Sequence, residues 1–160
     1  MITFEDVELL VDLDSDPEVM RYLTGGRPST RAEVAGVVRK EIGHRWIAYE
    51  RGSNEFVGWF GLRPTSPDEY ELGYRLRRTA WGRGLATEGG KMLVAYAFDD
   101  LGAERVWAGT MTVNTASRRV MEKCGLRHFR TMHLDWPEPI EGDEEGDVEY
   151  ELRRPAGSGG

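Results

Sequence analysis

The chain has 160 residues, of which 39% are hydrophobic and 31% are charged, a composition that suits one globular domain and gives no sign of disorder. Its single cysteine excludes an internal disulfide framework and a cysteine-built zinc site. The net charge of -7 argues against a general nucleic-acid binder, because such proteins neutralise phosphates with clustered basic residues.

The first third of the chain is predicted to be helical. Apolar residues recur at helical spacing over residues 4–11 and again over 19–23. Ser29 or Thr30 then caps a third helix, which we expect to run to about Ile42.

Strands and helices are mixed in the rest of the chain. The apolar alternation predicts strands over 45–49, 56–62, 70–76, 105–110, 128–136 and 148–153. Helices are expected over 84–99 and from Asn114 to just before Gly125. This order predicts a mixed α+β fold in one domain over 1–154, followed by a flexible tail over 155–160.

Nothing in the chain indicates a membrane segment or a secretory leader. No apolar run approaches the roughly 18 residues of a membrane span. The first residues do not resemble a signal peptide either. We therefore expect a cytoplasmic protein with no membrane or nucleic-acid partner.

A glycine-rich turn over residues 81–88, W-G-R-G-L-A-T-E, separates a predicted strand from a predicted helix. Gly82 and Gly84 let the backbone pass close to a ligand, and the helix's free N–H groups and dipole favour an anion. The nearby arginines, expected to raise the potential further, are Arg75, Arg77, Arg78 and Arg83. The alternative is a tight turn that uses glycine for its geometry alone. Gly89-Gly90 favours the ligand site, because each glycine inside a helix costs about 1 kcal/mol and so indicates a close approach.

The pattern around this turn excludes two familiar phosphate sites. A dinucleotide fold requires a third glycine where Thr87 stands, and an acidic residue at the end of the next strand. Glu104 has the right spacing but opens its strand. A P-loop is excluded because the chain has no G-K-[S/T] sequence.

The turn resembles the acyl-CoA pyrophosphate loop of the GNAT N-acetyltransferases, whose pattern is Gln/Arg-x-x-Gly-x-Gly/Ala. Gly84 and Ala86 match it, and Trp81 in the first position is typical of the RimJ/RimL-like branch. Further segments resemble the family in the same order over about residues 5 to 153: 16–20, 71–74 and 114–126. The resemblance implies the GNAT fold, a central, mostly antiparallel sheet flanked by helices.

The resemblance implies acetyl-CoA as the co-substrate, with no metal. Its pyrophosphate would lie on the turn at Trp81, Gly82, Arg83, Gly84, Leu85, Ala86 and Thr87. Its pantetheine arm would pair with Tyr74, Arg75 and Leu76 on the preceding strand, which splays from the strand over 105–110. An amide near Leu76 would polarise the acetyl carbonyl.

The implied reaction is direct attack of a neutral amine on the thioester. Glu71 is the first candidate for the base that deprotonates the amine, and Glu69, on the same face of the strand, is the second. Where many relatives carry a tyrosine as acid, this chain has Met121, so Ser117 becomes the candidate donor. The thiolate could also leave unprotonated, as its pKa is near ~8.5. Asn114 either contacts CoA or acts only as a helix cap.

The acceptor is expected to be a primary amine, bound near the predicted acidic hairpin. Residues 137–151 carry eight acidic side chains and no basic one. With Trp136 and the early helices, this segment would shape an acceptor cleft suited to a cationic amine: a protein N-terminus, a polyamine or an aminoglycoside-like amine.

Two departures from the family carry further expectations. The segment that usually follows a first strand begins almost at Met1, so that strand is expected to be short or missing. The sheet edge would then be partly open, and a second copy of the chain could cover it. Met121 also motivates an alternative function, a non-catalytic acyl-CoA-binding or regulatory module.

Overall fold

Six strands form one sheet in the order β1-β2-β3-β4-β6-β5. The computed structural model describes residues 1–135 and 137–157. Every neighbouring pair is antiparallel except β3 and β4. The strands are β1 (Arg45–Tyr49), β2 (Phe56–Ser66), β3 (Glu69–Leu76), β4 (Arg105–Met111), β5 (Arg127–Met132) and β6 (Asp147–Arg153). This mixed, mostly antiparallel sheet confirms the predicted fold class.

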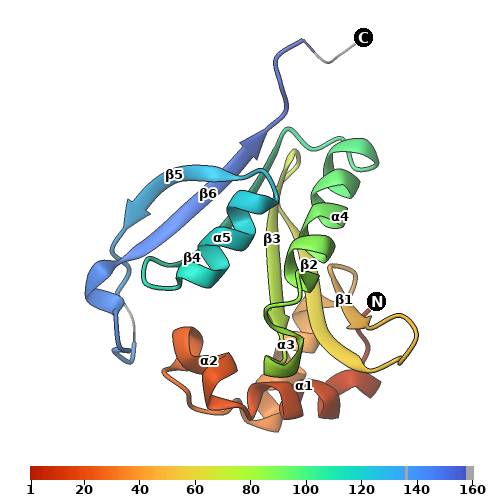
Figure 1. Ribbon diagram of the computed structural model, residues 1–160, viewed down its shortest axis with the longest axis vertical. Helices are drawn as coiled ribbons and strands as arrows, with labels where there is room; N and C mark the ends of the chain where they lie inside the picture. The colour runs from red at the N-terminus through yellow and green to blue at the C-terminus, as the bar shows by residue number, and fades with distance from the viewer. Residues whose placement is uncertain (136, 158–160) are drawn as a thin grey trace.

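Helices pack on both faces of the sheet (Figure 1). They are α1 (Val7–Asp14), α2 (Pro17–Thr24), α3 (Arg31–Glu41), α4 (Leu85–Asp99) and α5 (Thr115–Lys123), with short 3-10 helices at Phe4–Asp6, Arg78–Ala80 and Asp143–Glu145. Alternate residues of β2 serve two separate cores: Trp59 packs with α1 and α3, while Phe60 packs with α4. We call these the α1/α3 face and the α4/α5 face.

The early helices begin and end as local sequence dictates. Thr30 caps α3, and Glu33 returns a hydrogen bond to the Thr30 N–H in a complete capping box. Gly25 ends α2 in the left-handed conformation. Among the described residues no strand precedes α1, and the Ile2 N–H donates to the Arg45 carbonyl at 2.9 Å. The short or missing first strand is therefore confirmed.

Two strands end more than one residue away from their predicted boundaries. β2 continues past Leu62 to Ser66, because its end forms a hairpin with β3 beyond the reach of β1. Pro64 is tolerated on this stretch because only one side of the strand is paired. β5 ends at Met132 rather than reaching Trp136, and Trp136 lies outside the described residues.

Candidate active site

The facing edges of β3 and β4 are only partly paired. Glu69–Glu71 pair with Arg105–Trp107, and beyond these residues the two strands form no ladder. β3 nevertheless continues to Leu76 and β4 to Met111, each paired with its outer neighbour. The predicted splay between the two strands is thus present, and it opens toward their carboxyl ends.

The glycine-rich turn follows the open end of β3. Gly82 and Gly84 have φ values of +70° and +76°, and a Cβ on either would meet no atom within 4 Å. Glycine is therefore required by backbone conformation rather than by protein packing. Gly84 is the N-cap of α4 and offers no capping side chain, so the first N–H groups of the helix have no acceptor in the described chain. Such a turn suits an anionic ligand.

The arginines around this turn are all paired with carboxylates, which corrects the expectation that they raise the potential freely. The pairs are Arg75–Asp14, Arg77–Asp12, Arg78–Asp16 and Arg83–Glu50. Three of the acidic partners come from the end of α1 and the residues just after it, so these pairs tie the early helices to the end of β3. Arg83 remains beside the turn with 45% of its side chain exposed.

The two glycines inside α4 allow close packing within the protein. The interpretation of Gly89-Gly90 as evidence for a ligand site is therefore wrong. A Cβ on Gly89 would lie 2.3 Å from the Phe60 ring, and one on Gly90 would lie 2.6 Å from Cys124 Sγ. The close approach comes from the protein itself. Burial raises the pKa of the Cys124 thiol, which fits a structural role.

A tryptophan connects the end of β3 to the glycine-rich turn. The Trp81 indole N–H donates to the Leu76 carbonyl at 2.9 Å, while the residue as a whole stays 46% exposed. Leu76 is buried against α4 residues, whereas Arg75 points to the α1/α3 face and Asp14. The predicted pantetheine strand and pyrophosphate turn are therefore contiguous.

A pair of hydroxyl groups lies on the α4/α5 face beside the splay. The Tyr74 hydroxyl is 2.9 Å from Ser117 Oγ and 3.1 Å from the Ser117 carbonyl oxygen. Burial raises the pKa of Tyr74 to about 12, against a lowering effect of the Ser117 hydrogen bond. Asn114 caps α5 by accepting the Ser117 N–H at 3.3 Å. The sequence placed Tyr74 only as a backbone contact, because its partner lies 43 positions away.

Met121 does not line this region. It is 2% exposed and belongs to the core between α4, α5 and the sheet. Methionine at this position therefore serves packing.

The candidate bases lie on the opposite face, at the paired end of β3. Glu71 forms an ion pair with Arg63, and 29% of its side chain is exposed. Glu69 is 3.3 Å from Arg105, whose guanidinium also binds Glu149 and Glu151. Both glutamates share one face, as predicted from strand alternation.

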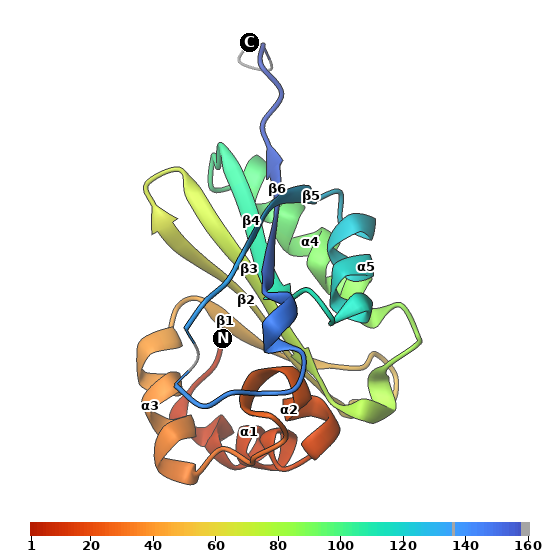
Figure 2. The ribbon, with the colours of Figure 1, turned by 90° about the vertical axis from the view of Figure 1, so that its left-hand side faces the viewer.

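Part of the acidic segment is buried in the sheet. Asp147 and Glu149 on β6 are 8% and 6% exposed, and Glu149 binds Arg105 and Arg130 from neighbouring strands. The loop before β6 descends toward α2 (Figure 2), where Ile140 approaches Gly25 closely enough for a Cβ there to contact it at 3.0 Å.

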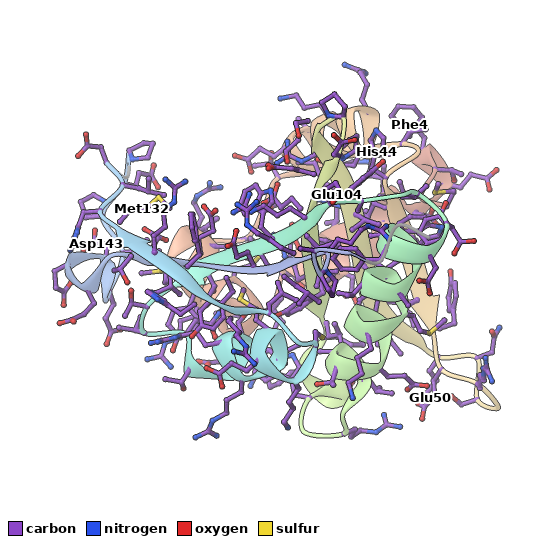
Figure 3. The ribbon with its side chains drawn as sticks, turned by 90° about the horizontal axis from the view of Figure 1, so that it is seen from above. Phe4, His44, Glu50, Glu104, Met132 and Asp143 are labelled. Carbon is purple, nitrogen blue, oxygen red and sulfur yellow. The ribbon has the colours of Figure 1, made fainter. Side chains whose placement is uncertain are left out.

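The loop and the glycine-rich turn lie far apart. Figure 3 places Asp143 of the loop and Glu50, the partner of Arg83, at opposite ends of the molecule. The acidic loop is therefore separate from the glycine-rich turn.

A cavity of about 260 Å³ lies on the α1/α3 face. Its lining combines apolar side chains with both charges: Leu10, Asp14, Ser29, Glu33, Val34, Val37, Glu41, Arg45, Trp59 and Arg75. No group of three or more metal-binding side chains is present in the described ranges, and no described helix could cross a membrane.

Comparisons with known proteins agree with this geometry. A family model described as an acetyltransferase (GNAT) domain matches residues 1–127. A curated protein of Aspergillus fumigatus, FsC-acetyl coenzyme A-N(2)-transacetylase, is 38% identical over 94% of this chain and 70% of its own.

Two solved structures share the fold. A GNAT-family acetyltransferase from Bacillus anthracis has a TM-score of 0.80 and 26% identity, covering 95% of this chain and 91% of its own. Spermidine N-acetyltransferase from Vibrio cholerae, solved with CoA and spermine, also has a TM-score of 0.80, at 14% identity, covering 95% and 92%. At that identity the second likeness concerns the fold alone.

Proposed function

The chain belongs to the GNAT family of acetyltransferases, and we propose that it moves an acetyl group from acetyl-CoA to a primary amine by direct attack in a ternary complex. One observation carries the proposal: a helix start with free N–H groups adjoins the open splay of β3 and β4. An anionic cofactor can bind at the start of this helix while its reactive end enters the splay between the strands.

We infer that the cofactor's pyrophosphate binds the N–H groups from Gly82 to Thr87. Arg83 can add a charged contact, because 45% of its side chain is exposed beside the turn. The pantetheine arm would pair with the unpaired edge of β3 from Tyr74 to Leu76. An N–H near Leu76 would then stabilise the oxyanion that forms at the acetyl carbonyl.

The amine approaches from the α1/α3 face in this proposal. Glu71 lies there at the paired end of the splay, with part of its carboxylate open to solvent. An ammonium must lose a proton before it can attack, so Glu71 accepts that proton directly or through water.

The proposed acceptor is a small cationic amine or a protein N-terminus. The cavity on the same face is lined by three carboxylates, each of which is paired with an arginine, so an ammonium group could bind there by competing for a carboxylate. The Aspergillus fumigatus relative, 38% identical, is named as an acetyl coenzyme A-N(2)-transacetylase, and this supports a nitrogen acceptor. The acidic loop would approach the same face past α2.

The second candidate function is a non-catalytic acyl-CoA-binding module. It is motivated by Met121, which cannot donate a proton. Both functions require CoA binding, so only turnover separates them.

Thiol release from acetyl-CoA against a panel of amines tests the proposal. We expect release with at least one cationic amine, and a loss of about 100-fold in kcat for Glu71→Gln at neutral pH. Glu69→Gln, two positions earlier on the same face, is the matched variant and should lose less.

Three outcomes would contradict parts of this assignment. CoA binding without release for any amine would favour the non-catalytic module. Full activity of Glu71→Gln would exclude Glu71 as the base. A larger loss in Glu69→Gln would move that role to Glu69.

A further inference from the structure

The hydroxyl pair of Tyr74 and Ser117 connects the two sides of the splay. Tyr74 stands three positions beyond Glu71, the last residue of β3 that pairs with β4. Ser117 lies in the first turn of α5, which follows β4. The hydrogen bond between them therefore connects β3, at the part of its edge that does not pair with β4, to α5, the helix that follows β4.

The pair also lies on the route from the glycine-rich turn into the splay. The end of β3 leads through the 3-10 helix Arg78–Ala80 to the start of α4, so the free N–H groups follow the same end of the strand that carries Tyr74. Tyr74 packs against the same apolar cluster as Leu85 and Leu93 of α4. A ligand held by its anionic end at α4 reaches the splay beside this hydroxyl.

We propose that Tyr74 is the proton donor to the departing CoA sulfur and that Ser117 is its positioning residue, an inference that rests on the proposed acetyl transfer. Before the attack, the first proton of the ammonium group passes through Glu71 to solvent. The neutral amine nitrogen then forms a bond to the carbonyl carbon and gives a second proton to Glu71. The C–S bond then breaks with its electron pair on sulfur, and the Tyr74 O–H proton passes to that sulfur. The products are the N-acetylated amine and the CoA thiol, and solvent returns the base's proton to Tyr74.

The surroundings of Tyr74 suit a donor. With its pKa raised by burial to about 12, the phenol carries its proton at neutral pH. The same desolvation raises the basicity of a thiolate that forms beside it. As the proton leaves, Ser117 Oγ can donate to the phenolate oxygen, and the positive end of α5 stabilises the charge. Asn114 fixes Ser117 by accepting its N–H.

Tyr74→Phe tests the assignment, with Tyr70→Phe as the matched control. Tyr70 is on the same strand and the same face and also packs partly buried against the core, but it lies at the paired end. For Tyr74→Phe we expect kcat to fall about 100-fold while the Kd for CoA stays within twofold. Because the donor acts on the leaving group, the loss should be equal for every amine accepted. Tyr70→Phe should keep wild-type kcat.

Ser117→Ala provides a second variant that keeps the tyrosine. We expect its kcat to fall about fivefold, as for the loss of one hydrogen bond, again with unchanged CoA affinity. If Tyr74→Phe does not fold, Ser117→Ala alone tests the proposal. An unchanged kcat for Ser117→Ala would then overturn it.

The remaining outcomes separate this inference from the function on which it rests. Wild-type turnover together with an unaffected Tyr74→Phe overturns the donor role alone. A loss of CoA affinity that accounts for the whole fall in kcat/KM also overturns it, because the hydroxyl would then only bind the cofactor. Absence of thiol release by the wild-type chain with every amine would contradict the acetyl transfer itself.

Discussion

The two ends of β3 differ in pairing and in charge. At the amino end, Glu69–Glu71 are hydrogen-bonded to β4, and Arg105 binds carboxylates from β3 and β6. At the carboxyl end the edge toward β4 is unpaired, and a neutral pair of hydroxyls stands beside it. The same strand thus carries a fixed end and an open end within eight residues.

This difference shows how a sheet can contain an opening without losing its order. Ion pairs join β3, β4 and β6 at the amino end of β3. The two strands can therefore separate at the other end while the sheet stays ordered. We call Arg105 with Glu69, Glu149 and Glu151 the Arg105 cluster. At the open end, by contrast, the α4/α5 face carries the neutral hydroxyl pair, while Arg75 lies on the opposite face and is paired with Asp14.

Removal of the central guanidinium should have the largest effect. Arg105→Met leaves Glu149 buried with only the exposed Arg130 as partner, so we expect a loss of about 3–5 kcal/mol in the free energy of unfolding. Arg153 binds Glu151 from the surface with 59% of its side chain exposed. Arg153→Met is therefore the control, with an expected loss below about 1 kcal/mol. Urea unfolding of both variants measures the difference, and equal losses would show that the cluster does not hold the closed end.

The open end depends on the turn that follows it. Gly84→Ala places a side chain at a φ of +76°, and we expect acetyl-CoA to bind about tenfold more weakly because the N–H groups shift. Gly102, after α4, has a φ of +70° and equally open surroundings. Gly102→Ala should lose similar stability and keep its affinity. Calorimetric titration with acetyl-CoA distinguishes them, and matching affinities would place the cofactor elsewhere.

Features that arise from neighbouring residues could be predicted from sequence. The capping box involves Thr30 and Glu33, which are only three positions apart in the sequence. The glycines of the turn indicate a left-handed backbone conformation by residue type alone. The helix and strand order followed from the same local patterns. The family motifs predicted a cofactor turn directly after the strand over 70–76, and in the structure the glycine-rich turn does follow β3.

Features that depend on distant partners could not be predicted in this way. Gly89 faces Phe60, which belongs to a strand far earlier in the chain, so its role was mistaken for ligand approach. The acidic segment contains no base of its own, yet Arg105 and Arg130 neutralise Glu149 across the sheet. Sequence spacing does not report such pairs, because they form only when the register of the sheet is set.

The smallest expected effect concerns the tyrosine of the open end. Its pKa is raised by burial from the ordinary value of 10 to about 12, so the folded protein favours the neutral phenol. This contribution to stability is complete below pH 10 and is lost as the pH rises toward 12. Between pH 9 and 11 the wild-type chain should therefore lose about 1 kcal/mol more than Tyr74→Phe.

Denaturant unfolding of both proteins at a series of pH values measures this difference, with Tyr70→Phe as the control for removal of a tyrosine at the closed end. Parallel curves for the wild type and Tyr74→Phe would mean that the phenol is already open to water when the cofactor is absent. The open end of β3 would then differ from the closed end in solvation as well as in pairing, and Tyr74 would meet the thioester as an exposed group. A steeper loss in the wild type instead means that the donor is buried beforehand and keeps its proton until the sulfur arrives.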